Sequence, residues 1–560
     1  MKFDDVLALL GEFGPYQKRL YFLVCLTGIC VAFQTLASVF TLTVPPHRCK
    51  IPGYDNDTYA VQNGYHHELV NLTIPVSDGK YSKCEVYTNG DSTLLSRGDN
   101  FTKRECDSWV YDRSTFVSTI ATDLDIVCGD RLVRTLSNSL VLAGKLVGST
   151  LQCFISDIFG RKKAFFMFLF LMILTGFANY FPFNFTSLMI FRFLAGLTTT
   201  STFLGAFVIG VEFVGPSKRV WTGLVIELFW VLGMVIMAGL AYFLRDWHHL
   251  VLALASPAVL FLSYWWLIPE SPRWLMSKGR LKEAENIIRK VAKVNKVTLP
   301  ETLFDEKTKA ADNEPKGKLK EMFTNKTLAV RSLILFYIWM VSSLVYYGLT
   351  LNVSNLSGNI YVNFVLSALV EAVGYILAIF LLDRVGRRML LCALMTLGGV
   401  ACVLTVFPAV YAGGTADWSL MMLSLVGKMG SSGAFGVIYI FTAELYPTPL
   451  RNIGLGVNLT FSRIGGVISP FISDLGILVG GTFGEQALPL VVFGVTAVLA
   501  GGLALALPET LNRKLPETIE DAKAIGSDTK HKHKYKMRTE GQAESVFAVA
   551  YTNTEYHVTS

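Results

Sequence analysis

Charged residues are scarce in this chain: Asp, Glu, Lys and Arg make up 17% of its 560 residues, whereas soluble domains carry roughly 25%. Hydrophobic residues, at 52%, take their place. They gather in runs of about 20 residues, and each run could cross a hydrocarbon layer of about 30 Å as one helix. The formal charge of +7 falls between these runs, so it does not indicate nucleic-acid binding. The sequence predicts an integral membrane protein.

Sequence motifs of catalytic, nucleotide-binding and metal sites are also missing. No phosphate-binding loop follows a strand, and the histidines of the polar segments, such as His47 and His248, lack the spacing of metal ligands. ATP-driven transport, a metal site, a cofactor and enzymatic activity are therefore not expected. The segment Met1–Gly14 carries acidic residues ahead of the first apolar run, unlike a cleavable signal peptide, so the first run is expected to remain as a membrane span.

Twelve apolar runs predict twelve transmembrane helices. The runs cover residues 20–42, 132–155, 164–181, 188–210, 220–243, 249–268, 331–351, 361–382, 389–412, 418–442, 452–475 and 486–507. Twelve spans put both termini on one side, and the clusters Arg161–Lys163, Lys218–Arg219 and Arg384–Arg388 lie on that side too. By the positive-inside rule, both termini are predicted to be cytoplasmic.

The segment between the first two runs, residues 43–131, is long and polar. It holds three glycosylation sequons, at Asn56, Asn71 and Asn100. It also contains four of the nine cysteines, namely Cys49, Cys84, Cys106 and Cys128. These features predict an extracellular, glycosylated loop with disulfide bonds. Four cysteines allow three pairings, which the sequence leaves open, and a metal site is the rival interpretation.

The remaining segments complete the predicted organisation. Residues 1–19 form a cytoplasmic N-terminus, 20–268 a first six-helix half, 269–330 a cytoplasmic connector, 331–507 a second half and 508–560 a cytoplasmic tail. Within the connector, apolar residues recur at helical spacing between residues 281 and 297, with Lys and Arg between them. We therefore expect an amphipathic helix there.

Three short motifs occur twice, in the same order. Asp157–Arg161 follows the second span as Asp383–Arg387 follows the eighth, both reading DxxGR. A Glu and an Arg seven positions later end the fourth and tenth spans, and Pro-Glu follows the sixth and twelfth. One duplicated six-helix unit explains all three repeats, and two such halves form an architecture used by secondary transporters.

These motifs resemble the major facilitator superfamily, in which DxxGR follows the second and eighth spans. The large first loop, Pro269–Leu275 and Ala443–Thr448 are similar to the organic cation and carnitine transporters, closest to the carnitine-type and invertebrate branches. The resemblance runs from about Phe3 to Glu520. It implies an all-α fold of two six-helix halves and alternating access to a central site.

Charges at the predicted cytoplasmic helix ends are implied by the resemblance to close an inner gate. They are Asp157, Arg161, Glu212 and Arg219 in the first half and Asp383, Arg387, Glu444 and Arg451 in the second. Ion pairs among them are expected to stabilise the outward-facing state and to break when the halves rock. The alternative is that they only end helices and fix the topology.

Charges inside spans are costly unless they face a cavity or a partner. Glu371 occupies a position where cation-transporting relatives carry a glutamate, so the resemblance implies that it attracts a positive group. Arg463 stands where carnitine-type and anion-transporting relatives have an arginine, which implies a substrate carboxylate. Alternatively, Glu227 or Glu371 neutralises Arg463 as a structural pair. The sequence does not decide between a structural role and a substrate-binding role for Glu227, and it assigns no role to Lys145 and Lys428.

Aromatic rings in the spans suit protonated or quaternary amines, because ring faces attract cations. The resemblance places Phe203, Phe207, Trp230 and Tyr346 at aromatic or cavity positions and Tyr439 at a carnitine-branch tyrosine. Each ring taken singly also fits ordinary packing.

The sequence thus predicts a plasma-membrane secondary transporter of small organic cations or zwitterions, with sodium as one candidate coupling ion. An organic anion exchanger, favoured by Arg463, is the alternative within transport. A receptor or scaffold that kept the fold but lost transport is the alternative of another class.

Overall fold

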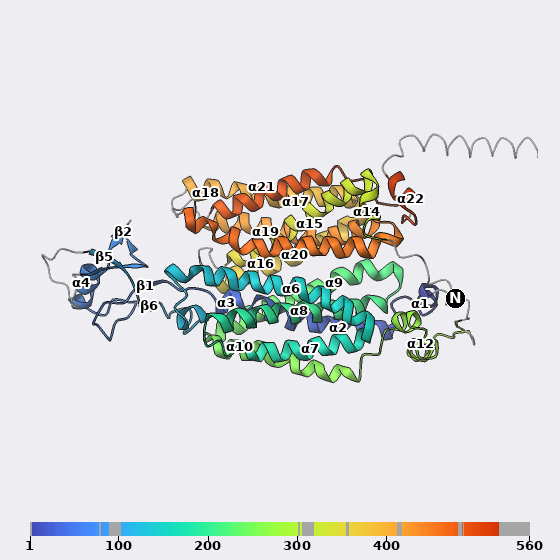
Figure 1. Ribbon diagram of the computed structural model, residues 1–560, viewed down its shortest axis with the longest axis horizontal. Coiled ribbons are helices and arrows are strands. Elements are labelled where there is room, and N and C mark those ends of the chain that lie inside the picture. Colours follow the sequence, from blue (N-terminus) through green and yellow to red (C-terminus); the bar gives the residue numbers. More distant parts are fainter. Residues whose placement is uncertain are drawn as a thin grey trace, which may run out of the picture.

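The computed structural model describes residues 3–77, 80–88, 102–300, 303–304, 318–353, 358–411, 417–479, 484, 487–513 and 515–525. Its long helices form two bundles stacked on each other, with the N-terminal half below and the C-terminal half above in the view of Figure 1. A small domain projects from one end of the bundles, and α1 (Phe3–Leu9) and α22 (Ile519–Ala524) lie at the other. Both ends of the described chain therefore lie opposite the projecting domain.

The N-terminal half follows the predicted order of spans. Its helices are α2 (Pro15–Leu36) with α3 (Ser38–Thr41), α6 (Arg131–Phe159), α7 (Arg161–Ala178), α8 (Phe185–Glu212), α9 (Arg219–Phe243), and α10 (Trp247–Ala255) with the 3-10 helix η3 (Ser256–Trp265). The short 3-10 helix η2 (Pro216–Lys218) precedes α9. The sixth predicted span is therefore part α-helix and part 3-10 helix, with Pro257 at the change.

The C-terminal half repeats this order. Its helices are α15 (Lys326–Asn352), α16 (Ile360–Val385), α17 (Arg387–Leu404) with α18 (Val406–Tyr411), α19 (Asp417–Leu445), α20 (Thr448–Val479) and α21 (Leu488–Ala504). Most buried apolar residues of the second half form a cluster of their own, which includes Trp339 and Phe441, both fully buried. The cluster of the first half continues into α16 through Tyr361, Phe364 and Tyr375, so the halves share apolar packing where they meet.

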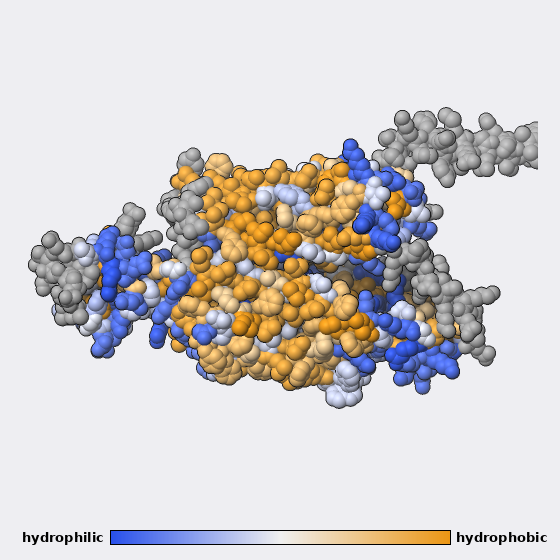
Figure 2. Space-filling view, viewed as in Figure 1, coloured by the Kyte–Doolittle hydropathy of each residue, from blue (hydrophilic) through white to orange (hydrophobic). Residues whose placement is uncertain are grey.

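Ten helical spans in the described chain are long and apolar enough to cross a membrane. The other two are α7, whose first turn carries Arg161, Lys162 and Lys163, and α21, which is 17 residues long. On the face that Figure 2 shows, apolar residues cover the middle of both bundles and polar residues gather at the two ends. This surface is what a lipid bilayer requires of a bundle of spanning helices.

Small residues let helices approach closely. A side chain at Gly196 on α8 would overlap the carbonyl of Val141 on α6, and one at Gly465 on α20 would overlap that of Met340 on α15. Such backbone contact is the usual way in which membrane helices pack, because lipid tails leave little hydrophobic drive between them.

The projecting domain, called the loop domain below, covers the described residues between 43 and 130. It contains the antiparallel pairs β1 (His47–Cys49) with β6 (Trp109–Tyr111), β2 (Val76–Ser77) with β3 (Lys80–Tyr81), and β4 (Glu85–Thr88) with β5 (Thr102–Glu105). Helices α4 (Gly64–Thr73), α5 (Ile120–Asp123) and the 3-10 turn η1 (Cys128–Asp130) complete it.

Two disulfide bonds join the predicted cysteines, Cys49 to Cys106 and Cys84 to Cys128. The prediction of disulfides is confirmed, and the pairing that the sequence left open is now defined. Asn56 and Asn71 have exposed side chains, as glycosylation requires, whereas Asn100 lies outside the described residues. Glycosylation itself stays a prediction.

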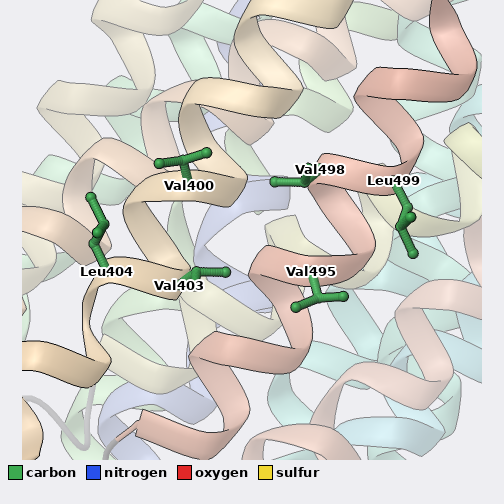
Figure 3. A pocket seen from close by; sticks show the side chains of 6 residues that line it. All are labelled: Val400, Val403, Leu404, Val495, Val498 and Leu499. Carbon is green, nitrogen blue, oxygen red and sulfur yellow. The ribbon is translucent and has the colours of Figure 1, made fainter.

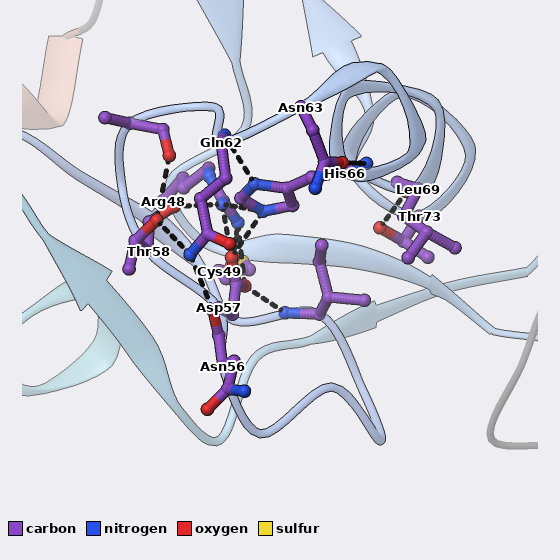
Figure 4. A network of polar contacts seen from close by, with 12 residues as sticks. Arg48, Cys49, Asn56, Asp57, Thr58, Gln62, Asn63, His66, Leu69 and Thr73 are labelled. Carbon is purple, nitrogen blue, oxygen red and sulfur yellow. Dashed lines mark hydrogen bonds and ion pairs between the residues drawn. The ribbon is translucent and has the colours of Figure 1, made fainter.

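A buried polar network organises the loop domain (Figure 4). The carboxylate of Asp57 lies 2.5 Å from Arg48 Nη2 and 2.9 Å from His66 Nε2, and it accepts the Ile51 N–H. Burial alone raises the pKa of Asp57, but hydrogen bonds from Arg48, Ile51 and His66 outweigh burial and hold the pKa below its ordinary value. The charged carboxylate is therefore the form that folding favours.

The predicted amphipathic connector helix is confirmed as α12 (Leu281–Asn295), which buries Ala284, Ile288 and Val291. Asn295 ends it and holds the N-terminal segment through hydrogen bonds to Gln17 and to backbone atoms of Leu10 and Tyr16. The shorter helices α11 (Pro272–Ser277) and α14 (Glu321–Thr324) flank it in the chain. The connector is thus anchored to the first half.

Candidate functional site

The eight predicted substrate residues lie on six helices of both halves. Phe203 and Phe207 are on α8, Glu227 and Trp230 on α9, Tyr346 on α15, Glu371 on α16, Tyr439 on α19 and Arg463 on α20. Five of these side chains are partly exposed, namely Phe203, Phe207, Glu227, Tyr439 and Arg463. Figure 2 shows a polar recess between the halves towards the end opposite the loop domain.

A chain of hydrogen bonds crosses between the halves at the centre. The indole N–H of Trp230 donates to the hydroxyl of Tyr346 over 3.2 Å, and that hydroxyl donates to Glu371 Oε1 over 2.8 Å. Tyr375 donates to the same carboxylate oxygen over 3.4 Å. The aromatic prediction and the glutamate prediction therefore converge on one place.

Glu371 is already partnered within its own half. The ammonium of Lys428 on α19 lies 3.2 Å from Glu371 Oε2 and also contacts the hydroxyl of Thr350 and the ring of Tyr346. Glu371 and Lys428 are 0% and 1% exposed, so this is a buried ion pair. The carboxylate that we expected to attract a cation is thus neutralised in this conformation by a lysine that the sequence left unassigned.

Arg463 has no carboxylate partner in the described part of the chain. Its Nη1 donates to the hydroxyl of Tyr347 over 3.5 Å, and the same oxygen accepts a 3.1 Å hydrogen bond from Lys145 on α6. Neither Glu227 nor Glu371 forms an ion pair with Arg463 among the described residues. The structural-pair interpretation of Arg463 therefore has no support in this geometry.

Glu227 is the second acid of the centre. It lies one helical turn before Trp230 on α9, and Glu371 and Arg463 are the charged groups that act on it electrostatically. The described residues include no basic group in ion-pair contact with it. A partly exposed carboxylate that has no basic partner in the described chain is available to a positively charged ligand.

Aromatic side chains surround these charges. The rings of Phe203 and Trp230 lie 6.3 Å apart, and Tyr439 packs against Trp339 and Phe435 at 4.6 and 5.7 Å. Phe435 in turn stacks on Tyr346 at 6.0 Å. The rings of Phe203, Trp230, Tyr346 and Tyr439 are therefore connected, and Phe207 packs with Phe203 against a cluster that includes Tyr21 and Cys25.

Sequence reasoning gave no role to five residues of this centre: Lys145 and Lys428, which were noted but left unassigned, and Tyr347, Tyr375 and Phe435, which were not singled out. Both lysines carried a usable signal, because a charge inside an apolar run is expected to have a function. The three aromatics carried none, since aromatic residues occur throughout the spans and only the crossing of α15, α16 and α19 brings them together.

The predicted gate charges cluster around one arginine in each half. Arg161 lies 2.5 Å from Asp157 and 3.3 Å from Glu212, and Arg387 lies 3.1 Å from both Asp383 and Glu444. The repeat seen in the sequence is thus a repeat of geometry. Arg219 donates to the carbonyl of Val214, and Arg451 has Glu444 as its nearest acid.

All of these ion pairs join residues of the same half. Polar contacts between the halves lie at the centre, where Trp230 donates to Tyr346 and Lys145 to Tyr347. Others lie towards the loop domain, where Thr135 donates to Asp474, Ser139 to the carbonyl of Val467 and Tyr361 to that of Thr115. In the described chain the halves are therefore tied together near the loop domain, and the gate charges leave the opposite end unbridged.

The repeated Pro-Glu motif has a local structural role. Glu270 accepts the backbone N–H of Lys162 over 3.1 Å, and Glu509 accepts those of Arg387 and Arg388 over 3.0 and 3.1 Å. Each glutamate thus caps the helix that begins at the arginine of DxxGR, where a carboxylate is favoured. The intervening Gly160 and Gly386 have φ of 108° and 96°, and a side chain at either would meet the capping carboxylate.

A groove on the outer surface between α17 and α21 is of a different kind. Its lining is apolar throughout: Val400, Val403, Leu404, Val495, Val498 and Leu499 (Figure 3). With no charged or polar side chain it offers nothing that could orient an ion, so the central residues remain the candidate substrate site.

Comparisons with known proteins agree with this architecture. The sequence profile of the family "Sugar (and other) transporter" matches residues 58–521. The chain is 40% identical to the "Organic cation transporter protein" of Drosophila melanogaster, covering 94% of this chain and 95% of that one. It is 35% identical to human "Organic cation/carnitine transporter 2", covering 92% and 93%. The xylose transporter XylE from E. coli, in an inward-open conformation, superposes with a TM-score of 0.59 at 14% identity, covering 91% and 99%.

Proposed function

Since this chain belongs to the sugar (and other) transporter family, and within it to the organic cation and carnitine transporters of the major facilitator superfamily, we propose that it moves small organic cations or zwitterions across the plasma membrane. It is a multi-pass membrane transporter, and the predicted fold class and family are confirmed. The proposed cycle is binding and release by alternating access, without bond chemistry and without ATP.

The observation that carries this proposal is the charge arrangement of the centre. Glu227 is a carboxylate without a basic partner in the described chain, on the same helix as Trp230, whose ring packs edge-on near that of Phe203. Arg463 is a guanidinium without an acidic partner there, on the opposite half. A molecule with an ammonium and a carboxylate would supply both missing partners, because buried charges favour opposite charges nearby.

We also propose that the loop domain is extracellular and both termini are cytoplasmic. Exposed sequons and two disulfides suit the outside of the cell, and the basic clusters suit the inside. On this orientation the halves are joined at their extracellular end. The gate charges would then bridge the halves only after the carrier turns outward.

An organic anion exchanger is the second candidate, because Lys145 and Arg463 bring two cations to one hydroxyl. The test is voltage-clamped uptake of labelled tetraethylammonium, carnitine and a dicarboxylate, each with and without sodium, by wild type and by Arg463→Asp. The proposal expects uptake of carnitine or the cation by wild type and a shift towards the pure cation in the variant. Uptake of the dicarboxylate alone would replace the proposal with the anion exchanger.

A further inference from the structure

The hydroxyl of Tyr347 is where two positive side chains from opposite halves meet. Lys145 on α6 donates to it over 3.1 Å, and Arg463 on α20 donates over 3.5 Å. An ammonium and a guanidinium group can donate hydrogen bonds but cannot accept them, so the tyrosine oxygen is the acceptor for both. A neutral oxygen is a weak acceptor for two cations compared with a carboxylate.

No acid in the described chain lies in ion-pair contact with either member of this pair. In the described chain, Lys145 and Arg463 form no ion pair, and Lys145 is 3% exposed and otherwise faces the rings of Tyr347 and Trp230, at 4.8 and 5.7 Å. The acid Glu371 is held by Lys428 at 3.2 Å. Glu227 is the remaining acid of the centre, so the centre holds one more positive than negative side chain.

The surroundings of Tyr347 on the loop-domain side add to the excess. A small cavity of about 20 Å³ lies there between the halves, lined among others by Arg192, Asn138 and Thr350. Arg192 is buried and donates to Asn138 over 3.4 Å, and no carboxylate contacts it in the described chain. Arg192 therefore adds a third positive side chain near Tyr347.

We infer that Lys145 and Arg463 form, around the hydroxyl of Tyr347, a two-cation subsite for the carboxylate of a substrate, so that the carrier selects zwitterions over cations that lack an acidic group. This inference rests on the proposed function and names Lys145 as a residue that determines specificity. A carboxylate has room for several donors on its two oxygens, so it can accept from both side chains at once.

The subsite also bears on the transport cycle. Lys145 belongs to the N-terminal half and Arg463 to the C-terminal half. A carboxylate bound to both would join the halves at the centre, whereas a cation bound only at Glu227 and Trp230 would contact one half. The carboxylate would therefore assist the closing of the halves around the substrate and raise the transport rate of zwitterions.

The test uses two probes that differ only in the acidic group, carnitine and carnitine methyl ester, with uptake measured under voltage clamp as KM and maximal rate. The variants are Lys145→Met, Lys145→Arg, and Lys163→Met as a control on an exposed lysine of the same half. Surface protein is quantified for each. Lys145→Met is expected to raise the KM for carnitine about tenfold or more and to leave the KM for the ester unchanged, because one charged hydrogen bond is lost. Lys145→Arg keeps the charge and should stay near wild type.

Wild type alone provides a second test if Lys145→Met fails to reach the surface. The test compares carnitine, an analogue with a sulfonate in place of the carboxylate, and carnitine methyl ester. The two zwitterions should bind similarly, and the ester should bind at least tenfold more weakly. Equal KM values for all three, or equal effects of Lys145→Met on carnitine and ester, would overturn the inference and leave the proposed function standing. If wild type takes up none of the probes, both fail.

A chloride ion could supply the same negative charge, so one arm replaces chloride with gluconate. The inference expects carnitine uptake to be the same in both media. Loss of carnitine and ester uptake alike without chloride would show that the subsite holds an inorganic anion and would overturn the inference.

Discussion

The ammonium of Lys428 lies 3.2 Å from the carboxylate of Glu371, with both side chains buried inside the C-terminal half. The two residues come from different helices, α19 and α16, so the pair fixes how these helices cross. Since Tyr346 bonds both Glu371 and Trp230, the pair also sets the position of the central contact between the halves.

Removing one member of this pair should be costly. Glu371→Gln leaves the Lys428 ammonium buried without a counter-charge, which typically costs about 3–5 kcal/mol. We expect lower surface expression and a lower midpoint of thermal unfolding for the purified variant. The double variant Glu371→Gln, Lys428→Met should recover much of both, since no lone charge remains. Wild-type stability of the single variant would show that the pair is not closed in the membrane.

The gate charges predict a defect in turnover rather than in folding. Asp157→Asn removes one of the two acids on Arg161, and because Asp157 is 72% exposed the loss in stability should be small. We expect a several-fold lower transport rate at equal surface expression. Glu283→Gln, which breaks the exposed pair with Arg280 in the connector, is the matched control. Unchanged turnover of Asp157→Asn would leave these charges with a purely topological role.

Asp474 is predicted to hold the halves together near the loop domain. Asp474→Ala removes the acceptor of the Thr135 hydroxyl, and one hydrogen bond to a charged group corresponds to a population shift of about tenfold. A cysteine placed at Ser139, which is buried between α6 and α20, should then react faster with an impermeant thiol reagent added outside. Asp107→Ala, on the exposed surface of the loop domain, is the control. Equal labelling rates would argue against this closure.

The loop domain should depend on pH through Asp57. Its pKa in the folded chain is below the ordinary value of about 4. The stabilisation is therefore fully present above the ordinary pKa and is lost as the pH falls through the lower, folded pKa. Asp57→Asn keeps the sequon at Asn56 but lacks this stabilisation at every pH. Proteolysis of the loop domain on intact cells should be faster for the variant at pH 7, with the wild type becoming sensitive only in strong acid. Equal sensitivity at pH 7 would contradict this role of the network with Arg48 and His66.

Much of the fold was predictable because its signals are local. A run of apolar residues defines a membrane helix by its length alone, and the repeated DxxGR and Pro-Glu motifs revealed the two halves without any distance. The structure adds the physical reason for the repeated Pro-Glu motif, since Glu270 and Glu509 cap the helices that begin at the arginine of DxxGR.

The candidate site was only half predictable, because its contacts join helices far apart in the chain. Trp230 and Tyr346 were expected at the centre, but nothing in the sequence pairs Glu371 with Lys428 or brings Lys145 to Tyr347. Helical periodicity gives the face of one helix and not the neighbour that it meets. The same limit left three disulfide pairings open, although all four cysteines were recognised.

The most direct test of the account is counterflow in proteoliposomes that contain the purified chain, with no ATP and no ion gradient. With unlabelled carnitine inside, we predict transient accumulation of external labelled carnitine above equilibrium, because a carrier with one alternating site exchanges substrate for substrate. Binding of carnitine without counterflow would contradict alternating access and favour a receptor or scaffold that has kept the transporter fold.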